Sequence, residues 1–128
     1  MDFTERLDLY KEGGMLTDND VKNVNAIIQM FKDDYNVLLQ EENADFFIAH
    51  ICAAYGRNVT KEEIDALPDV VRSELEGLDT YAESLQVLNR LLEVTDNPLS
   101  DVEKDYALLH INNLIGHFKD NNEWPIKK

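Results

Sequence analysis

The sequence predicts an all-α protein, a compact bundle of about five main helices. Apolar residues recur at helical spacing along most of the 128 residues, most regularly over 80–94. No window alternates apolar and polar residues, and neither Asn-Gly nor Asp-Gly occurs as a hairpin turn. The chain is 44% hydrophobic and 30% charged, which is typical of one folded domain. We therefore expect a single helical domain over 1–119, followed by a polar C-terminal tail over 120–128.

The N-terminal part of the chain is expected to form two helices. A short helix over 4–11 ends at Gly13-Gly14, because consecutive glycines stop a helix. Thr17 and Asp20 form an acidic variant of the capping box. The second helix should run from this cap to about Lys32, where a polar run begins.

The middle of the chain has one strong helical signal and one weak one. A helix is expected over 44–57, with Asn43 as its N-cap. The residues T-K-E-E at 60–63 match a full capping box, which predicts a short helical turn that Pro68 interrupts. Apolar residues over 70–78 predict another turn or two of helix.

The C-terminal part is expected to form two long helices. The first covers 80–94, where Tyr81, Leu85, Leu88 and Leu92 recur at helical spacing. The second begins at a full capping box, Ser100 to Glu103, and should run to about Lys119.

The predicted helix over 44–57 carries a histidine and an arginine on one face. His50 and Arg57 are seven residues apart, which places them about 10 Å apart along the helix axis. Only Ala53 and Ala54 lie between them on that face, which leaves room for an anion or a neighbouring helix. Taken alone, this pattern is explained more simply by a buried histidine near a helix end, with Arg57 pairing the last carbonyl groups.

A second histidine lies on the last predicted helix. Glu103, Tyr106 and His110 fall at i, i+3 and i+7 and therefore share a face. As a capping-box residue, Glu103 also has a structural role available at the start of this helix. The helices of His50 and His110 both carry apolar stripes that must be buried, which predicts that they pack as neighbours.

Together the two helices resemble the PTS regulation domain (PRD) family. That family carries one histidine on a helix ending H-I-x-x-A-x-x-R and a second in a later E-x-x-Y-x-x-x-H-I helix. The matching residues in this chain are His50, Ile51, Ala54 and Arg57, then Glu103, Tyr106, His110 and Ile111. The two motifs occur in the family's order and at its separation, and the resemblance covers the chain from about Leu7 to about Ile115.

The resemblance implies a free-standing regulatory domain of the bacterial cytoplasm that acts in transcription regulation or antitermination. It implies phosphorylation of His110 or His50 by HPr or an enzyme II component of the sugar phosphotransferase system. It also implies a homodimer whose formation is shifted by phosphorylation. His110 is the preferred phosphoacceptor because it keeps Glu103 and Tyr106 on its face. His50 instead follows Ala49, where many family members have an acidic residue.

Phosphoryl acceptance by histidine sets simple chemical requirements. The imidazole must be neutral, which an unperturbed pKa of about 6.5 provides at neutral pH. The added charge, roughly −2, needs a cation or hydrogen-bond donors. Arg57 is the expected phosphate-stabilising residue, since a guanidinium group pairs two phosphate oxygens. The acidic surface would oppose the new charge, so a phosphate there is expected to change packing between subunits.

Composition limits the partners of this chain. Its formal charge of −14 repels phosphate backbones and anionic lipids, so no direct contact with nucleic acid or membrane is expected. No apolar run approaches the ~20 residues of a membrane span, and the N-terminus lacks the pattern of a signal peptide. Cys52 is the only cysteine, which excludes an internal disulfide and fits a reducing cytoplasm.

Two alternatives stay open from the sequence. One is a helical protein-protein interaction module that is no longer phosphorylated, which Ala49 favours. The other is a small helical enzyme or metal protein, which only the histidines support. His110 and His117 are seven residues apart, too far for two ligands of one metal on a straight helix. A P-loop and a nucleophile elbow do not occur, so we expect no catalytic residue, no metal and no cofactor.

Overall fold

The computed structural model describes residues 3–60, 64–96 and 99–121, and this part of the chain contains helices and no strand. The prediction of an all-α bundle is confirmed, with a sixth helix where only a turn or two was expected. The helices are α1 (Thr4–Glu12), α2 (Asp18–Tyr35), α3 (Glu41–Thr60), α4 (Asp69–Glu76), α5 (Tyr81–Val94) and α6 (Asp101–Asp120). Among the described helices, none combines the length and the apolar character that crossing a bilayer requires.

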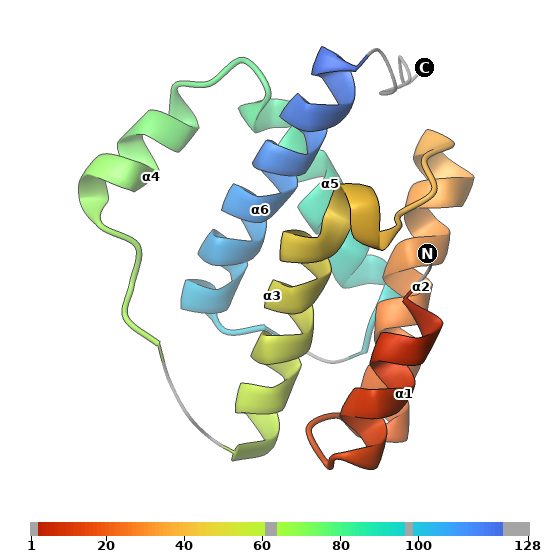
Figure 1. The fold of residues 1–128 in the computed structure, drawn as a ribbon. Helices are drawn as coiled ribbons and strands as arrows, with labels where there is room; N and C mark the ends of the chain where they lie inside the picture. The colour runs from red at the N-terminus through yellow and green to blue at the C-terminus, as the bar shows by residue number, and fades with distance from the viewer. Residues whose placement is uncertain (1–2, 61–63, 97–98, 122–128) are drawn as a thin grey trace.

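The helix α6 lies at the centre of the bundle. It packs against α3 on one side and against α5 on the other, while α2 packs against both α3 and α5. Figure 1 shows α3 and α6 side by side, with α5 behind them and α1 next to α2. The short helix α4 lies at the margin, on the outer side of α6 (Figure 1). The prediction that the helices of His50 and His110 pack against each other is therefore confirmed.

One hydrophobic cluster holds the bundle together, and every helix contributes to it. Apolar side chains at helical spacing point inward from each element, as the periodicity predicts. Leu75 anchors α4, and Cys52 of α3 is fully buried as a small core residue. The largest fully buried aromatic side chains are Tyr55, Phe3, Phe31 and Phe118. Burial of this kind is the main contribution to the stability of such a domain.

The helix caps explain where α2 begins and ends. Thr17 and Asp20 form the predicted capping box, with both reciprocal hydrogen bonds present. The helix continues one turn beyond Lys32, because Tyr35 is buried and packs against Phe31 with ring centroids 5.9 Å apart. It ends at Asn36, whose left-handed backbone (φ 56°) lets the amides of Asn36 and Val37 donate to the carbonyl groups of Lys32 and Phe31.

The bounds of α3 differ from the prediction at both ends. The helix begins at Glu41 and is kinked at Ala44, which has non-helical dihedral angles. Asn43 therefore does not cap a helix starting at residue 44; its side chain accepts a hydrogen bond from the amide of Gln40. At the other end Thr60 is still helical, so it does not open a new helix, and residues 61–63 of the expected capping box lie outside the described residues.

The start of α6 also differs from the prediction. The Ser100 hydroxyl accepts a hydrogen bond from the Glu103 amide at 3.2 Å. The reciprocal bond of a full capping box is not formed, because the Glu103 side chain is bonded to another helix. The helix ends at Asp120, one residue beyond the expected end at Lys119, and residues 122–128 of the expected tail lie outside the described residues.

Candidate functional site

The structure brings the two motif histidines together. The rings of His50 on α3 and His110 on α6 are stacked, with centroids 4.8 Å apart and an angle of 26° between their planes. Tyr106, one turn before His110, lies beside His50 at 6.1 Å between ring centroids. Two helices that are far apart in sequence thus form one site, as their apolar stripes predict.

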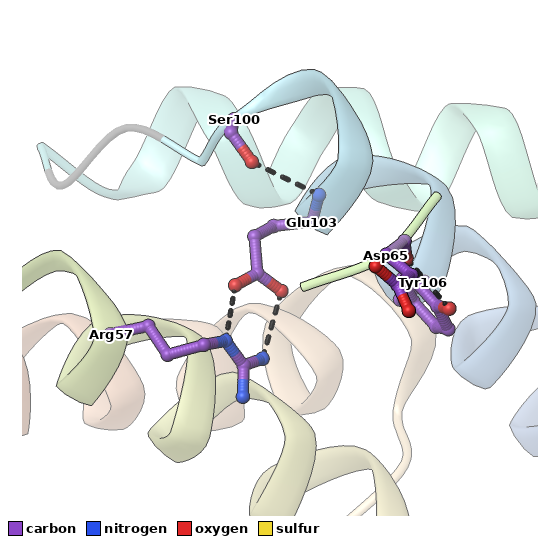
Figure 2. A network of polar contacts seen from close by, with 5 residues as sticks. All are labelled: Arg57, Asp65, Ser100, Glu103 and Tyr106. Carbon is purple, nitrogen blue, oxygen red and sulfur yellow. Dashed lines mark hydrogen bonds and ion pairs between the residues drawn. The ribbon is translucent and has the colours of Figure 1, made fainter. Parts of the chain in front are cut away.

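An ion pair crosses the same helix interface. The Arg57 guanidinium donates through Nε to Glu103 Oε2 at 2.6 Å and through a terminal nitrogen to Glu103 Oε1 at 2.9 Å. Both side chains are mostly buried, with exposed fractions of 20% for Arg57 and 7% for Glu103. Figure 2 shows this two-pronged contact, with Ser100 holding the first turn of α6 above it. Charge-assisted bidentate pairs of this kind fix both helices in one register.

Tyr106 ties the segment before α4 to the site. Its hydroxyl donates a hydrogen bond to the main-chain oxygen of Asp65 at 2.9 Å (Figure 2). Tyr106 therefore links His50, which its ring contacts inside the bundle, to the main chain of Asp65, which its hydroxyl contacts outside it. The predicted motif residues Glu103 and Tyr106 both have structural contacts at the site.

Both histidines are held in the neutral form. Burial lowers the pKa of His50 to about 4; the charge of His110 lowers it as well, and Glu103 partly offsets the shift. Burial also lowers the pKa of His110. His50 Nε2 is buried and has no hydrogen-bond partner within the described part of the chain. At neutral pH each ring therefore has one unprotonated nitrogen, which is the nucleophilic form of imidazole.

A pocket of about 520 Å³ opens beside His110, between the start of α3 and α6. Its lining includes His110 and not His50, so solvent reaches the pair from the His110 side. The other lining residues are Glu41, Glu42, Asn43, Ala44, Asp45, Phe46, Phe47, Asn113, Leu114 and His117. Phe46 is 80% exposed, the highest value among the large apolar side chains described.

Sequence reasoning missed this pocket. His117 lies seven residues after His110 on α6 and lines the same pocket, which its spacing in the sequence did not indicate. Phe46 gave no signal, because an exposed aromatic residue next to a buried one has no distinctive pattern in the sequence.

Most of one expected partner surface is buried inside this chain. We expected Ala53, Ala54 and Tyr55 to admit a partner helix, but Ala54 and Tyr55 are fully buried in the core and only Ala53 is partly exposed. The space between His50 and Arg57 is filled by α6, whose Glu103 occupies Arg57. The predicted pairing of Arg57 with a phosphate therefore stays a prediction, and it requires Arg57 to share or leave Glu103.

Within the described residues, no group of three or more histidine, cysteine, aspartate or glutamate side chains is arranged to hold a metal ion. The stacked histidines have Arg57 and Glu103 beside them, a pair already satisfied by its own contacts. The arrangement offers neutral imidazole nitrogens, a nearby guanidinium and an open pocket on one side. No protein-family model, curated protein or solved structure matches this chain.

Proposed function

We propose that this chain is a phosphorylatable regulatory domain of the sugar phosphotransferase system, similar to the PTS regulation domains. The observation that carries the proposal is the stack of His50 on His110, 4.8 Å apart, next to the Arg57–Glu103 pair. Both motifs that suggested the family thus contribute to one site. The domain accepts a phosphoryl group on histidine from HPr or an enzyme II component and is not itself an enzyme.

His110 is the proposed phosphoacceptor. It lines the open pocket, whereas Nε2 of His50 is enclosed. Its lowered pKa keeps the ring unprotonated at neutral pH, so a nitrogen lone pair is available for attack on phosphorus. A buried His50 stacked on it holds the His110 ring in one orientation.

Arg57 is the proposed phosphate-stabilising residue, and to act it would exchange its partner Glu103 for the phosphoryl group. Its positive charge is one of the causes that lower the pKa of His50, so its field already reaches the histidine pair. A phosphoryl group adds roughly −2 charge and competes with the Glu103 carboxylate for the guanidinium. Release of Glu103 would loosen α3 from α6, and this is the proposed route from phosphorylation to a change of shape.

The proposed output is regulation of transcription or antitermination through a cytoplasmic homodimer. This part of the proposal is supported by the resemblance of the motifs. Because Ala54 and Tyr55 are buried, they are not available to a partner helix, and the dimer must use another face. The described part of the chain is one helical bundle, so a nucleic-acid-binding partner would carry the output.

A second candidate is a helical interaction module that is no longer phosphorylated. Two observations favour it: Arg57 is occupied by Glu103, and Ala49 stands where many family members have an acidic residue. In this case the stacked histidines serve only to pack α3 against α6.

Intact-mass measurement after incubation with phosphoenolpyruvate, enzyme I and HPr separates the two candidates. We expect the wild type to gain the mass of one phosphoryl group and His110→Ala to gain none. His117→Ala is the matched control, because His117 is an exposed histidine of the same helix, and it should be labelled like the wild type. Label that persists in His110→Ala and vanishes in His50→Ala would move the acceptor to His50. An unlabelled wild type with every plausible donor would favour the interaction module.

A further inference from the structure

One segment of the chain lies outside the helical bundle and is only lightly attached to it. We call residues 64–79, which include α4, the strap. Only Leu67 and Leu75 of the strap are buried, and of these two only Leu75 belongs to the hydrophobic core cluster. Figure 1 shows the strap on the outer side of α6. Extended contacts join the other helices to one another, whereas α4 shares none with another described helix.

The strap is attached to one turn of α6 by a hydrogen bond and an ion pair. The Tyr106 hydroxyl donates to the main-chain oxygen of Asp65 at 2.9 Å (Figure 2). Arg72 of α4 pairs with Asp105, the residue before Tyr106. An exposed ion pair adds little to stability, and a single hydrogen bond adds only modestly to it. We therefore expect the strap to open at a lower free-energy cost than unfolding of the whole bundle.

The same turn of α6 connects the strap to the histidine pair. The Tyr106 ring lies beside His50, with 6.1 Å between ring centroids, and His50 is stacked on His110. Tyr106 therefore has its ring at the site and its hydroxyl on the strap. When the strap moves away, the hydroxyl loses its acceptor, and the ring loses a contact that fixes it beside His50. The pocket beside His110 is lined neither by His50 nor by the strap, so it lies on a different side of the pair.

We propose that the strap opens as a unit while the bundle stays folded, and that its opening exposes His50 through the release of Tyr106. The strap is then a gate on the His50 side of the histidine pair, whereas the pocket keeps His110 accessible in either state. Nε2 of His50, which is enclosed without a hydrogen-bond partner among the described residues, becomes reachable from solvent. This inference does not rest on the proposed function, because the opening is measured without a phosphoryl donor. Within the proposed function, the gate decides whether His50 competes with His110 for the phosphoryl group.

The test measures the opening of the strap and the exposure of His50 separately. Hydrogen exchange, followed by mass spectrometry on peptides that separate the strap from α5 and α6, reports the opening. The rate of carbethoxylation by diethyl pyrocarbonate at pH 7, resolved for each histidine by mass spectrometry, reports the exposure of His50. Both measurements use the full chain under native conditions.

Two variants loosen the strap, and each has a matched control. Tyr106→Phe removes the hydroxyl and keeps the ring, and its control is Tyr10→Phe, on a half-buried tyrosine of α1. Arg72→Ala removes the ion pair with α6. Its control is Arg90→Ala, because the Arg90 side chain also forms an ion pair and has the same exposed fraction, 45%, as that of Arg72.

In the wild type, we expect the hydrogen-bonded amides of α4 to be protected from exchange about a hundredfold less than those of α6. Tyr106→Phe should speed exchange in α4 about fivefold. Arg72→Ala should speed it about twofold. In each variant His50 should react faster by the same factor as the α4 amides exchange, because one opening exposes both. The reaction of His117, which is exposed, should not change, and both control variants should match the wild type in α4 and at His50.

Three results would overturn the gate. If the amides of α4 are protected as strongly as those of α6, the strap is part of the cooperative bundle and does not open by itself. If neither Tyr106→Phe nor Arg72→Ala speeds exchange in α4, these contacts do not hold the strap closed. If the variants speed exchange in α4 and leave the reaction rate of His50 unchanged, the strap opens without exposing the histidine. None of these results bears on phosphoryl transfer to His110, which the labelling experiment tests by itself.

Discussion

At the residue scale, the site is defined by what surrounds His50. Its ring is stacked on His110, its Nε2 is enclosed, and Glu103 and Arg57 act on it from the neighbouring turns. Protonating such a ring places a charge in a poorly solvated space next to another imidazole. The neutral pair is thus part of the folded state, and the stability of the fold depends on pH.

The first prediction concerns this pH dependence. The folded pKa of His50, about 4, lies below the unfolded value of about 6.5, so between these two pH values the unfolded chain binds more protons than the folded one. The contribution of the neutral His50 to stability is therefore fully present above about pH 6.5 and is lost as the pH falls toward 4. Between pH 7 and about pH 5, His50 should remove about 2 kcal/mol from the free energy of unfolding, measured by urea denaturation.

The variant His50→Gln should remove the part of this pH dependence that comes from His50, because glutamine does not titrate, and should leave the part that comes from His110. His117→Gln is the control and should keep the slope of the wild type, since His117 is exposed. Equal slopes for the wild type and His50→Gln would show that His50 is not held neutral by its surroundings.

A second residue-scale prediction concerns Glu103. Replacing it by alanine leaves Arg57 mostly buried without its carboxylate, and we expect a loss of about 3 kcal/mol in the free energy of unfolding. Glu83→Ala breaks the more exposed pair with Lys119 and should cost less than about 1 kcal/mol. Chemical denaturation of both variants gives the comparison. A similar small loss for both would mean that the Arg57–Glu103 pair does not hold α3 to α6.

At the scale of elements, the long helices could be predicted because their apolar periodicity and caps are local features. The predicted helix over 80–94 differs from α5 by one residue, and the Thr17 cap lies where expected. Ends set by tertiary contacts could not be predicted. The extra turn of α2 depends on Tyr35 being buried, and the first turn of α3 depends on a kink.

The candidate site was predictable only in part. The meeting of the two histidines follows from two apolar stripes that must be buried together. The pairing of Arg57 with Glu103 spans 46 residues, and the sequence offered Glu103 a local capping role instead. The pocket depends on the direction of Phe46 and on the distance between two helices, neither of which is a property of any short segment.

The packing of α5 on α6 gives a prediction at this scale. Asn112 is buried on α6, and its side-chain oxygen accepts hydrogen bonds from the hydroxyl groups of Thr80 and Ser84. Asn112→Ala should lower the free energy of unfolding by about 1 kcal/mol, because the Thr80 hydroxyl loses its acceptor, while the Ser84 hydroxyl keeps the main-chain oxygen of Thr80. Asn113→Ala, at the next and exposed position, should change it by less than about 0.5 kcal/mol. Equal effects in thermal unfolding would contradict a structural role for this contact.

At the scale of the whole molecule, charge and assembly are coupled. A chain with a formal charge of −14 repels its own copies, so a homodimer must bury enough apolar surface to overcome this repulsion. Added salt screens the repulsion. Phosphorylation adds further negative charge and is therefore expected to shift the equilibrium between monomer and dimer.

The assembly prediction follows from the proposed function. We expect light scattering to give about twice the chain mass of 14.7 kDa, with the dimer favoured by salt. Phosphorylated protein at the same concentration should show a different monomer–dimer ratio. A monomer at every salt concentration and in both phosphorylation states would contradict regulation through dimerisation.

The most direct test of the central claim is NMR of the histidine ring nitrogens in uniformly ¹⁵N-labelled protein, before and after incubation with phosphoenolpyruvate, enzyme I and HPr. Before incubation, both His50 and His110 should show the nitrogen shifts of neutral rings at pH 7. Afterwards, one ring nitrogen of His110 should show coupling to phosphorus, while His50 stays unmodified and His117 serves as the internal control. Phosphorus coupling at His50 or His117, or unchanged spectra with active donor proteins, would contradict the assignment of His110 as the phosphoacceptor.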